Sequence, residues 1–166
     1  PTAPVDETRG PLPPAAKRAK APHVALSSYS AQKPREAAGL LRQWKVPCLI
    51  HQPAYNLLNR WIEGDLLDAL SEEGMGCIAF TALAQGVLTD KYLAGIPRES
   101  RLNRPGGESL PREHLSEDNL RRVRALDAFA RGRRQSLAQM ALAWVLRDPR
   151  MTSTLIGASS PAQIRE

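Results

Sequence analysis

Apolar runs of strand length alternate along the chain with longer stretches in which apolar residues recur at helical spacing. The short runs occupy residues 23–30, 46–53, 76–83 and 152–160, and each ends in polar or small side chains. Near-continuous runs of this kind are typical of parallel strands that are buried on both faces. The helical spacing predicts helices over residues 33–44, 63–74, 120–129 and 136–145, and one more from residue 160 onward. The pattern therefore predicts four strands that alternate with helices.

Residues with strong capping preferences stand where these helices are expected to begin and end. Gly74 occupies a C-cap position after the second helix, and Ser136 with Gln139 forms a capping box before the fourth. The last helix is predicted from an N-cap, an N1 proline and an N3 partner, namely Ser160, Pro161 and Gln163.

Four strands alternating with helices predict an α/β fold in which helices cover a parallel sheet. A closed (β/α)8 barrel takes about 250 residues, so we expect a partial (β/α)8 TIM barrel in one domain over residues 23–166. Residues 1–22 carry six prolines and are predicted to be an irregular Pro-rich segment. The polar stretch 89–114 predicts a long functional loop. Because the chain starts with Pro1 and stops in an unfinished helix, we expect a piece of a longer protein.

Composition narrows the class of protein. The 166 residues are 42% hydrophobic, yet no run of about eighteen apolar residues predicts a membrane span, and no signal peptide is recognisable. The net charge of +6 comes from arginines spread over several segments without interleaved aromatics, which argues against nucleic-acid binding. Cys48 and Cys77 stand in apolar surroundings, which favours buried thiols in a reducing cytoplasm. The histidines and cysteines show no metal-ligand spacing.

Functional groups of such barrels lie at the carboxyl ends of the strands. There the chain offers neutral hydrogen-bonding groups and aromatics rather than a carboxylate pair, which suits an amide on a flat ring, while the last helix start suits a phosphate. Together these groups indicate a nicotinamide nucleotide. The residues at these positions are Ser27, Ser28, Tyr29, His51, Gln52, Tyr55, Phe80, Thr81, Leu83, Gly157, Ser159 and Ser160.

Structural roles remain open for most of these residues. Ser27 and Ser28 could end a strand and cap a turn, and Gln52 could satisfy a backbone group. Phe80 could belong to the core. A strand-end histidine such as His51 is more often hydrogen-bonded than catalytic. Lys91 and Arg101 could be ordinary surface charges.

Several stretches together resemble the aldo-keto reductase family, in particular the branch with glyceraldehyde-3-phosphate reductase-like enzymes and potassium-channel β subunits. They are "LSSYS", "WKVPCLIHQPAYNLLNR", "GMGCIAFTALAQGVLTDKYLAGIPRESR", "SLAQMALAWVLRDPRMTSTLIGAS" and "AQIRE". The resemblance covers residues 24–166 and implies a (β/α)8 barrel that binds NADPH in an extended form. This chain would then supply strands five to eight of that barrel, and thus its C-terminal half.

The resemblance also implies roles for individual residues. Ser27, Ser28 and Gln52 would hold the nicotinamide carboxamide, Phe80 would stack on the ring, and Tyr55 with Asn56 would shape the pocket beside it. The pyrophosphate side would be lined by Thr81, Leu83, Gln85, Gly86, Lys91 and Arg101. The adenosine and 2′-phosphate end would be held by Gly157, Ser159, Gln163 and Glu166.

The family's catalytic Asp, Tyr, Lys and His lie on its first four strands and have no counterparts here. Neither Tyr29 nor Tyr55 matches the catalytic Tyr, and Ala25 replaces an expected Gly. The resemblance therefore implies the NADP(H)-binding portion of a reductase that converts aldehydes or ketones to alcohols, inactive by itself. The alternatives are a non-catalytic, nucleotide-responsive interaction module and a truncated product without function. The expected partners are the nicotinamide cofactor and a small carbonyl substrate, and open sheet edges would permit self-association.

Overall fold

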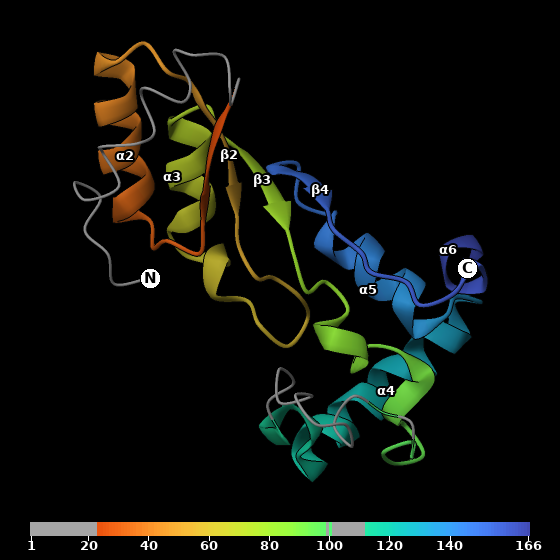
Figure 1. The fold of residues 1–166 in the computed structure, drawn as a ribbon. Helices are drawn as coiled ribbons and strands as arrows, with labels where there is room; N and C mark the ends of the chain where they lie inside the picture. The colour runs from red at the N-terminus through yellow and green to blue at the C-terminus, as the bar shows by residue number, and fades with distance from the viewer. Residues whose placement is uncertain (1–22, 99, 101–111) are drawn as a thin grey trace.

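The four predicted strands form one parallel sheet. The computed structural model describes residues 23–98, 100 and 112–166; the predictions for residues 1–22 and for Arg101 lie outside this part. The strands are β1 (Val24–Ser27), β2 (Cys48–Gln52), β3 (Gly76–Ala79) and β4 (Met151–Thr154). They pair in parallel in the order β1-β2-β3-β4, so sequence neighbours are also neighbours in space (Figure 1).

Helices follow the strands, as the alternating pattern predicts. They are α2 (Gln32–Gln43), α3 (Leu66–Glu72), α4 (Glu117–Gly132), α5 (Leu137–Val145) and α6 (Pro161–Arg165). In Figure 1, α2 and α3 lie side by side next to the sheet, and α5 lies beyond β4. Short 3-10 helices occupy Trp61–Glu63, Ala84–Gly86, Asp90–Tyr92 and Arg112–Leu115. No helix of the described residues is both long and apolar enough to cross a membrane.

The predicted element ends were less accurate than the elements themselves. The first, third and fourth strands end earlier than predicted, since Ser28 (φ 57°) and Thr81 (φ 55°) adopt left-handed backbone conformations and β4 stops at Thr154. The second helix was expected from residue 63, but the non-helical backbone of Gly64 separates a 3-10 turn from α3. The capping box of Ser136 and Gln139 is confirmed.

The buried apolar residues form two main clusters. The first packs α3, the residues after β2 and the helix-facing side of β3, and contains Tyr55, Ile62, Leu67 and Cys77, all with no exposed surface. The second joins the segment after β3 to α4 and α5. Its buried members are Ala84, Val87, Leu88, Tyr92, Val123, Leu137 and Ala141.

Gly76 lies where two strands approach closely, and its replacement by alanine is expected to destabilise the sheet. A Cβ at this position would lie 2.7 Å from Thr152 Oγ1 and 3.1 Å from Ile50 Cδ1, and the same Thr152 oxygen accepts the Cys77 N–H at 3.1 Å. Relieving that overlap should lower the free energy of unfolding by about 1–3 kcal/mol, measured by urea denaturation.

Gly39→Ala is the matched control for this substitution. Gly39 lies in α2 and has no neighbour within 4 Å of an added Cβ, so alanine should stabilise the protein by about 0.5–1 kcal/mol. Equal effects of the two substitutions would contradict the close approach at Gly76.

Candidate functional site

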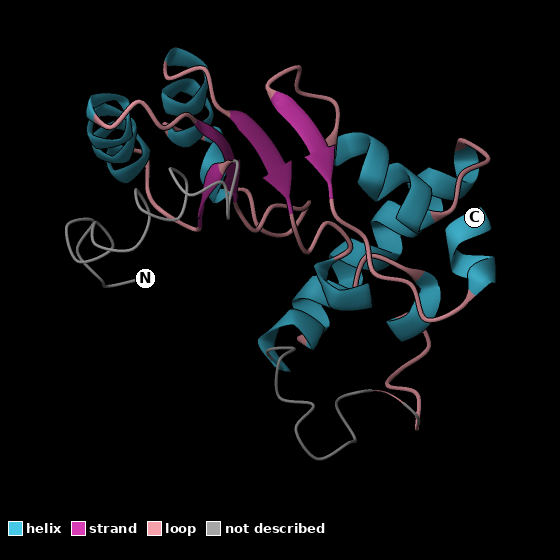
Figure 2. Ribbon diagram, turned by 45° about the horizontal axis from the view of Figure 1, so that its top comes forward, coloured by secondary structure: helices cyan, strands magenta, loops and turns pink. Residues whose placement is uncertain are grey.

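The carboxyl ends of the strands meet at one edge of the sheet. The arrowheads in Figure 2 point toward this edge, where the loops begin. At β1 and β2 the edge is formed by Ser27, Ser28 and Gln52. Ser27 and Gln52 are register partners in the two strands, and Ser28 directly follows Ser27. The Ser27 hydroxyl donates to the Gln52 carbonyl at 2.9 Å, and the Ser28 N–H donates to the same oxygen at 3.2 Å. The structure therefore brings together the three residues that the sequence assigned to a carboxamide.

The side chain of Gln52 retains its hydrogen-bonding capacity. It is half-buried, and its amide has no hydrogen-bond partner among the described residues, whereas its backbone carbonyl accepts two hydrogen bonds. Gln52 does not use its side chain to satisfy a neighbouring backbone group, which was the structural alternative for this residue. A primary amide carries donors and an acceptor together and can pair with another amide.

The edge continues from β2 to β3 through backbone pairing. The Phe80 N–H donates to the Pro53 carbonyl at 3.0 Å, and the Tyr55 N–H donates to the Phe80 carbonyl at 3.2 Å. The Phe80 ring is half-buried rather than fully enclosed in the core. Asn56 donates from Nδ2 to the Thr81 carbonyl at 2.9 Å, while its Oδ1 accepts the N–H groups of two following residues. Asn56 thereby fixes the loop after β3 to the loop after β2.

Left-handed backbone conformations are concentrated along this edge. Ser28, Thr81, Ala84, Gln85 and Gly86 have φ values of 57°, 55°, 46°, 56° and 94°. A non-glycine residue with positive φ is uncommon, and such strain persists where the surroundings enforce it, often at binding sites. The sequence did not indicate Ala84, because alanine carries no preference for this conformation.

Lys91 lies in a self-contained turn after Gly86. Thr89 donates from Oγ1 to the Gly86 carbonyl at 2.7 Å and accepts the Lys91 N–H at 3.2 Å. The Lys91 ammonium lies 5.2 Å from the centroid of the buried Tyr92 ring. Lys91 is an exposed residue, so its charge is accessible to an anion from solution.

The residues predicted for the adenosine end lie on the exposed final segment, from Gly157 to Glu166. Gln163 accepts the Ser159 N–H at 2.7 Å, and Ser160 caps α6. Gln139, at the start of α5, donates to the Glu166 carbonyl at 2.6 Å. Within the described parts of the chain, no hydrogen bond joins this segment to the β1–β2 edge.

Two residues expected at this rim are instead fully buried. Tyr55 was predicted to shape the pocket, but its ring packs 5.2 Å from that of Trp144 and belongs to the core. Its hydroxyl donates to Glu63 at 2.6 Å and accepts from Arg147 at 2.8 Å. These partners satisfy the hydrogen-bonding capacity of the hydroxyl, and the ring is buried, so Tyr55 does not line the rim. His51 likewise has no exposed surface.

Burial and hydrogen bonds set the pKa values near the site. Burial lowers the pKa of His51 to about 4, and burial followed by the Glu63 hydrogen bond raises that of Tyr55 to about 12. The Arg60 hydrogen bond lowers the pKa of Glu63 to about 2. Burial raises the pKa of the free thiols Cys48 and Cys77 to about 11 and about 12, so both are protonated and inert at neutral pH.

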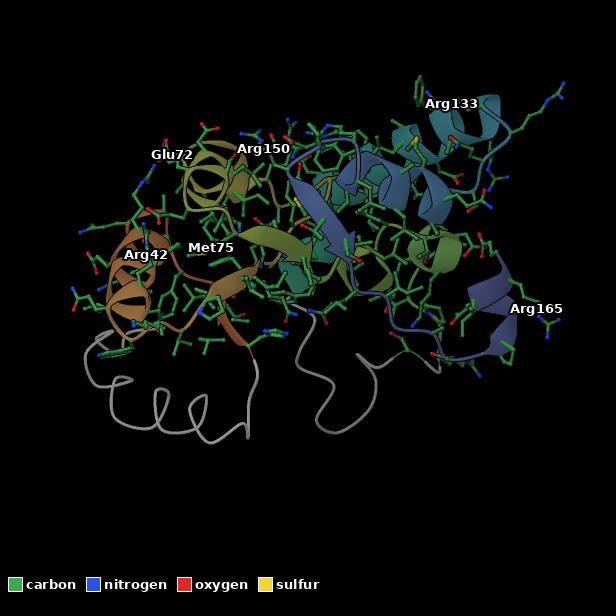
Figure 3. The ribbon with its side chains drawn as sticks, turned by 90° about the horizontal axis from the view of Figure 1, so that it is seen from above. Arg42, Glu72, Met75, Arg133, Arg150 and Arg165 are labelled. Carbon is green, nitrogen blue, oxygen red and sulfur yellow. The ribbon has the colours of Figure 1, made fainter. Side chains whose placement is uncertain are left out.

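The charged side chains of the described residues are spread over both ends of the molecule. Figure 3 shows Arg42, Glu72 and Arg150 at the α2–α3 end of the molecule, and Arg133 and Arg165 at the other end. Glu72 pairs with Arg35, and Arg150 pairs with Asp68 and Asp148. Among the described residues, no group of three or more His, Cys, Asp or Glu side chains could hold a metal ion.

A parallel sheet flanked by helices, with left-handed backbone conformations in the loops at its carboxyl edge, defines an α/β fold. The chain belongs to the aldo/keto reductase family, whose family model matches residues 1–166.

Curated relatives support this assignment, and a solved structure shares the fold. The chain is 52% identical over 166 residues to L-glyceraldehyde 3-phosphate reductase of Escherichia coli K12, covering 98% of this chain and 48% of the relative. It is 35% identical over 168 residues to a probable voltage-gated potassium channel subunit beta of Oryza sativa subsp. japonica, covering 99% and 51%. The structure of a glycerol dehydrogenase from Gluconobacter oxydans shares the fold, with a TM-score of 0.73, 24% identity and coverage of 98% and 47%. The chain spans about half the length of the curated relatives it matches.

Proposed function

We propose that the chain binds NADP(H) along the carboxyl edge of its sheet and forms the cofactor-binding portion of a reductase for aldehydes or ketones. The observation that carries the proposal is the half-buried amide of Gln52, which has no partner among the described residues and stands beside Ser27 and Ser28. This arrangement fits a carboxamide, because a primary amide can satisfy both the donor and the acceptor of another amide.

The remaining residues of the edge suit the other parts of such a cofactor. The Phe80 ring offers an apolar face to the flat ring, and Thr81, Leu83, Gln85 and Gly86 present the strained loop to the pyrophosphate. Lys91 and Arg101 supply positive charge, and Gly157, Ser159, Gln163 and Glu166 would hold the adenosine and its 2′-phosphate. When bound there, a reduced nicotinamide would supply a hydride for the carbonyl carbon of the substrate. The chain's own residues orient the carboxamide and compensate the phosphate charge.

The protonation step would need a general acid, and among the described residues neither Tyr55 nor His51 is placed to provide one. Tyr55 is buried, and the pKa of its hydroxyl is raised to about 12. The His51 ring is also fully buried. In our proposal the family's catalytic Asp, Tyr, Lys and His have no counterparts in this chain, so the purified chain is expected to show no carbonyl reduction above a protein-free control.

Removal of the Gln52 amide is expected to weaken cofactor binding. The titration follows nucleotide fluorescence and thermal shift of the purified chain with NADPH and then NADH. Gln52→Ala should raise the Kd for NADPH by about 2–12-fold, which corresponds to the loss of one hydrogen bond worth about 0.5–1.5 kcal/mol. Gln43→Ala, at the exposed end of α2 and the opposite edge of the sheet, is the matched control and should leave Kd unchanged.

The outcomes separate the proposal from its rivals. Saturable binding, tighter for NADPH than for NADH, would support an NADP(H) site. A cooperative melting transition without any nucleotide binding would refute it. Equal losses for Gln52→Ala and Gln43→Ala would remove Gln52 from the site.

A second candidate is a non-catalytic module in which the nucleotide regulates a protein contact. It is favoured by the 35% identity with the potassium channel subunit beta of Oryza sativa. A protein partner that co-purifies in fixed ratio, with an affinity that changes on adding NADPH, would favour this function over a reductase.

A further inference from the structure

His51 makes an unusual contact for a fully buried histidine. It lies on the central strand β2, with Leu26 of β1 and Cys77 of β3 as its register partners. It has no exposed surface. Its Nε2 accepts the backbone N–H of Tyr29 at 3.3 Å, and its buried Nδ1 has no hydrogen-bond partner among the described residues. A buried polar atom without a partner is rare enough in native proteins to require an explanation.

The contact with Tyr29 defines the state of the ring. A nitrogen that accepts an N–H carries no proton, so the proton of neutral His51 is on Nδ1. A charged ring would place a second N–H against that of Tyr29, and the hydrogen bond would be lost. The acceptor role therefore exists only while His51 is neutral.

The segment held by His51 is the one that carries Ser27 and Ser28. Ser28 turns the chain after β1 with a φ of 57°, and the Tyr29 N–H then points back to β2. Together with the hydrogen bonds of Ser27 and Ser28 to the Gln52 carbonyl, residues 27–29 are joined to two consecutive residues of β2. Without the His51 acceptor, the chain would lose the hydrogen bond of the Tyr29 N–H, which directly follows the left-handed residue Ser28.

We propose that His51 is a positioning residue, whose neutral ring holds the Tyr29 N–H and thereby fixes Ser27 and Ser28 for the carboxamide end of the cofactor, and that protonation of this ring releases the segment. The inference rests on the proposed cofactor site for its consequence in binding, but the anchoring of Tyr29 is independent of any ligand.

The neighbours of His51 do not offset a positive charge. Two titratable residues neighbour His51 along the sheet: Cys77, its register partner on β3, and Tyr29, which contacts the ring through its backbone N–H. Cys77 is a neutral thiol. The buried residues of α2 and α3 are apolar: Pro34, Ala37, Ala38, Leu41, Leu66, Leu67, Ala69 and Leu70. The charged residues of these helices are exposed or face one another, as in the pair of Arg35 with Glu72. Burial is accordingly the main cause of the lowered pKa of His51, and no charged side chain is among the causes.

Two substitutions at His51 separate anchoring from simple packing. In His51→Gln the amide oxygen can take the place of Nε2 and accept the Tyr29 N–H, but it does not titrate. In His51→Leu the volume is largely kept while the acceptor is lost. Both variants are first checked for a cooperative melting transition, and His51→Gln remains informative if His51→Leu does not fold.

The first readout is amide hydrogen exchange at Tyr29, measured by NMR without ligand. In the wild type the protection factor of this amide should fall by up to about tenfold per pH unit between pH 6.5 and 4, because opening of the segment frees a ring that then binds a proton. In His51→Gln the Tyr29 amide should stay protected at a level that does not depend on pH. In His51→Leu the Tyr29 amide should be unprotected at every pH. A pH-independent protection factor in the wild type would overturn the proposal.

The second readout, at pH 7, compares binding of NADPH with that of adenosine 2′,5′-bisphosphate, which lacks the nicotinamide. His51→Leu should weaken NADPH binding on the order of tenfold, the loss of about 1.4 kcal/mol, without changing the affinity for the adenosine compound. Equal losses for both ligands, or none for NADPH, would overturn the positioning role. If the wild type binds neither ligand, the proposed cofactor site fails, and the exchange experiment still decides whether His51 anchors Tyr29.

Discussion

Replacement of Tyr55 by alanine is expected to lower the free energy of unfolding by about 3–5 kcal/mol, the usual cost of removing a buried aromatic side chain. Tyr55 has no exposed surface and packs against Trp144 in the larger core cluster. Its hydroxyl also forms hydrogen bonds with Glu63 and Arg147, so the substitution removes both hydrogen bonds together with the ring. Urea denaturation followed by circular dichroism measures the change.

Two further variants divide this cost between ring and hydroxyl. Tyr55→Phe keeps the ring, and Glu63 keeps its contacts with Arg60 and Arg147, so a loss of only about 0.5–1.5 kcal/mol is expected. Phe129→Ala removes a ring that is 61% exposed and should change stability by less than about 0.5 kcal/mol. If Tyr55→Ala cost no more than Phe129→Ala, the Tyr55 cluster would not be the core of the molecule.

Stability is expected to fall as the pH falls from about 6.5 to about 4, and His51 is the expected cause. Its pKa is about 4 in the folded protein against 6.5 as the ordinary value. Within this window the unfolded chain binds a proton that the folded protein does not, so acid favours unfolding by about 1.4 kcal/mol per pH unit. His51→Gln should remove this slope. Urea denaturation at half-unit pH steps measures it.

A second acid-sensitive window lies lower and has a different origin. The pKa values of Glu63 and Asp148 are lowered to about 2, mainly by the hydrogen bonds from Arg60 and Arg150. The stability contributed by these carboxylates is complete above their ordinary values of 4.5 and 3.8 and is lost as the pH falls toward 2. His51→Gln should leave this lower window unchanged. An unaltered slope above pH 4.5 in that variant would assign the first window to another group.

The order of strands and helices could be predicted from the sequence because it follows from local patterns. The capping box of Ser136 and Gln139 acts within one turn of helix and is confirmed. The strand ends could not be predicted in the same way. Leu155 and Ile156 read as strand residues from their hydrophobicity, yet they follow β4 and are 48% and 53% exposed. The pairing that ends a strand depends on its neighbours, which a single apolar run does not reveal.

The same distinction applies to the candidate site. The adjacency of Ser27 and Gln52 follows from two parallel strands that end together, so the sequence could predict it. The burial of Tyr55 could not be predicted, because the hydroxyl partner Arg147 lies 92 residues further along the chain. The sequence also contained no indication of the left-handed backbone at Ala84. All assignments of residues to cofactor contacts, those of Phe80, Lys91 and the Gly157–Glu166 segment included, remain predictions.

Helix α5 belongs to both main clusters, with Ala141 in the one that holds the loop after β3 and Val145 in the one beneath the sheet. Packed interiors resist small displacements on either side. A movement of the loop that carries Gln85 and Gly86 would therefore press through α5 against the layer that supports β3 and β4. The loop and the sheet are therefore mechanically coupled through α5, and a distortion of either one also strains the packing of the other.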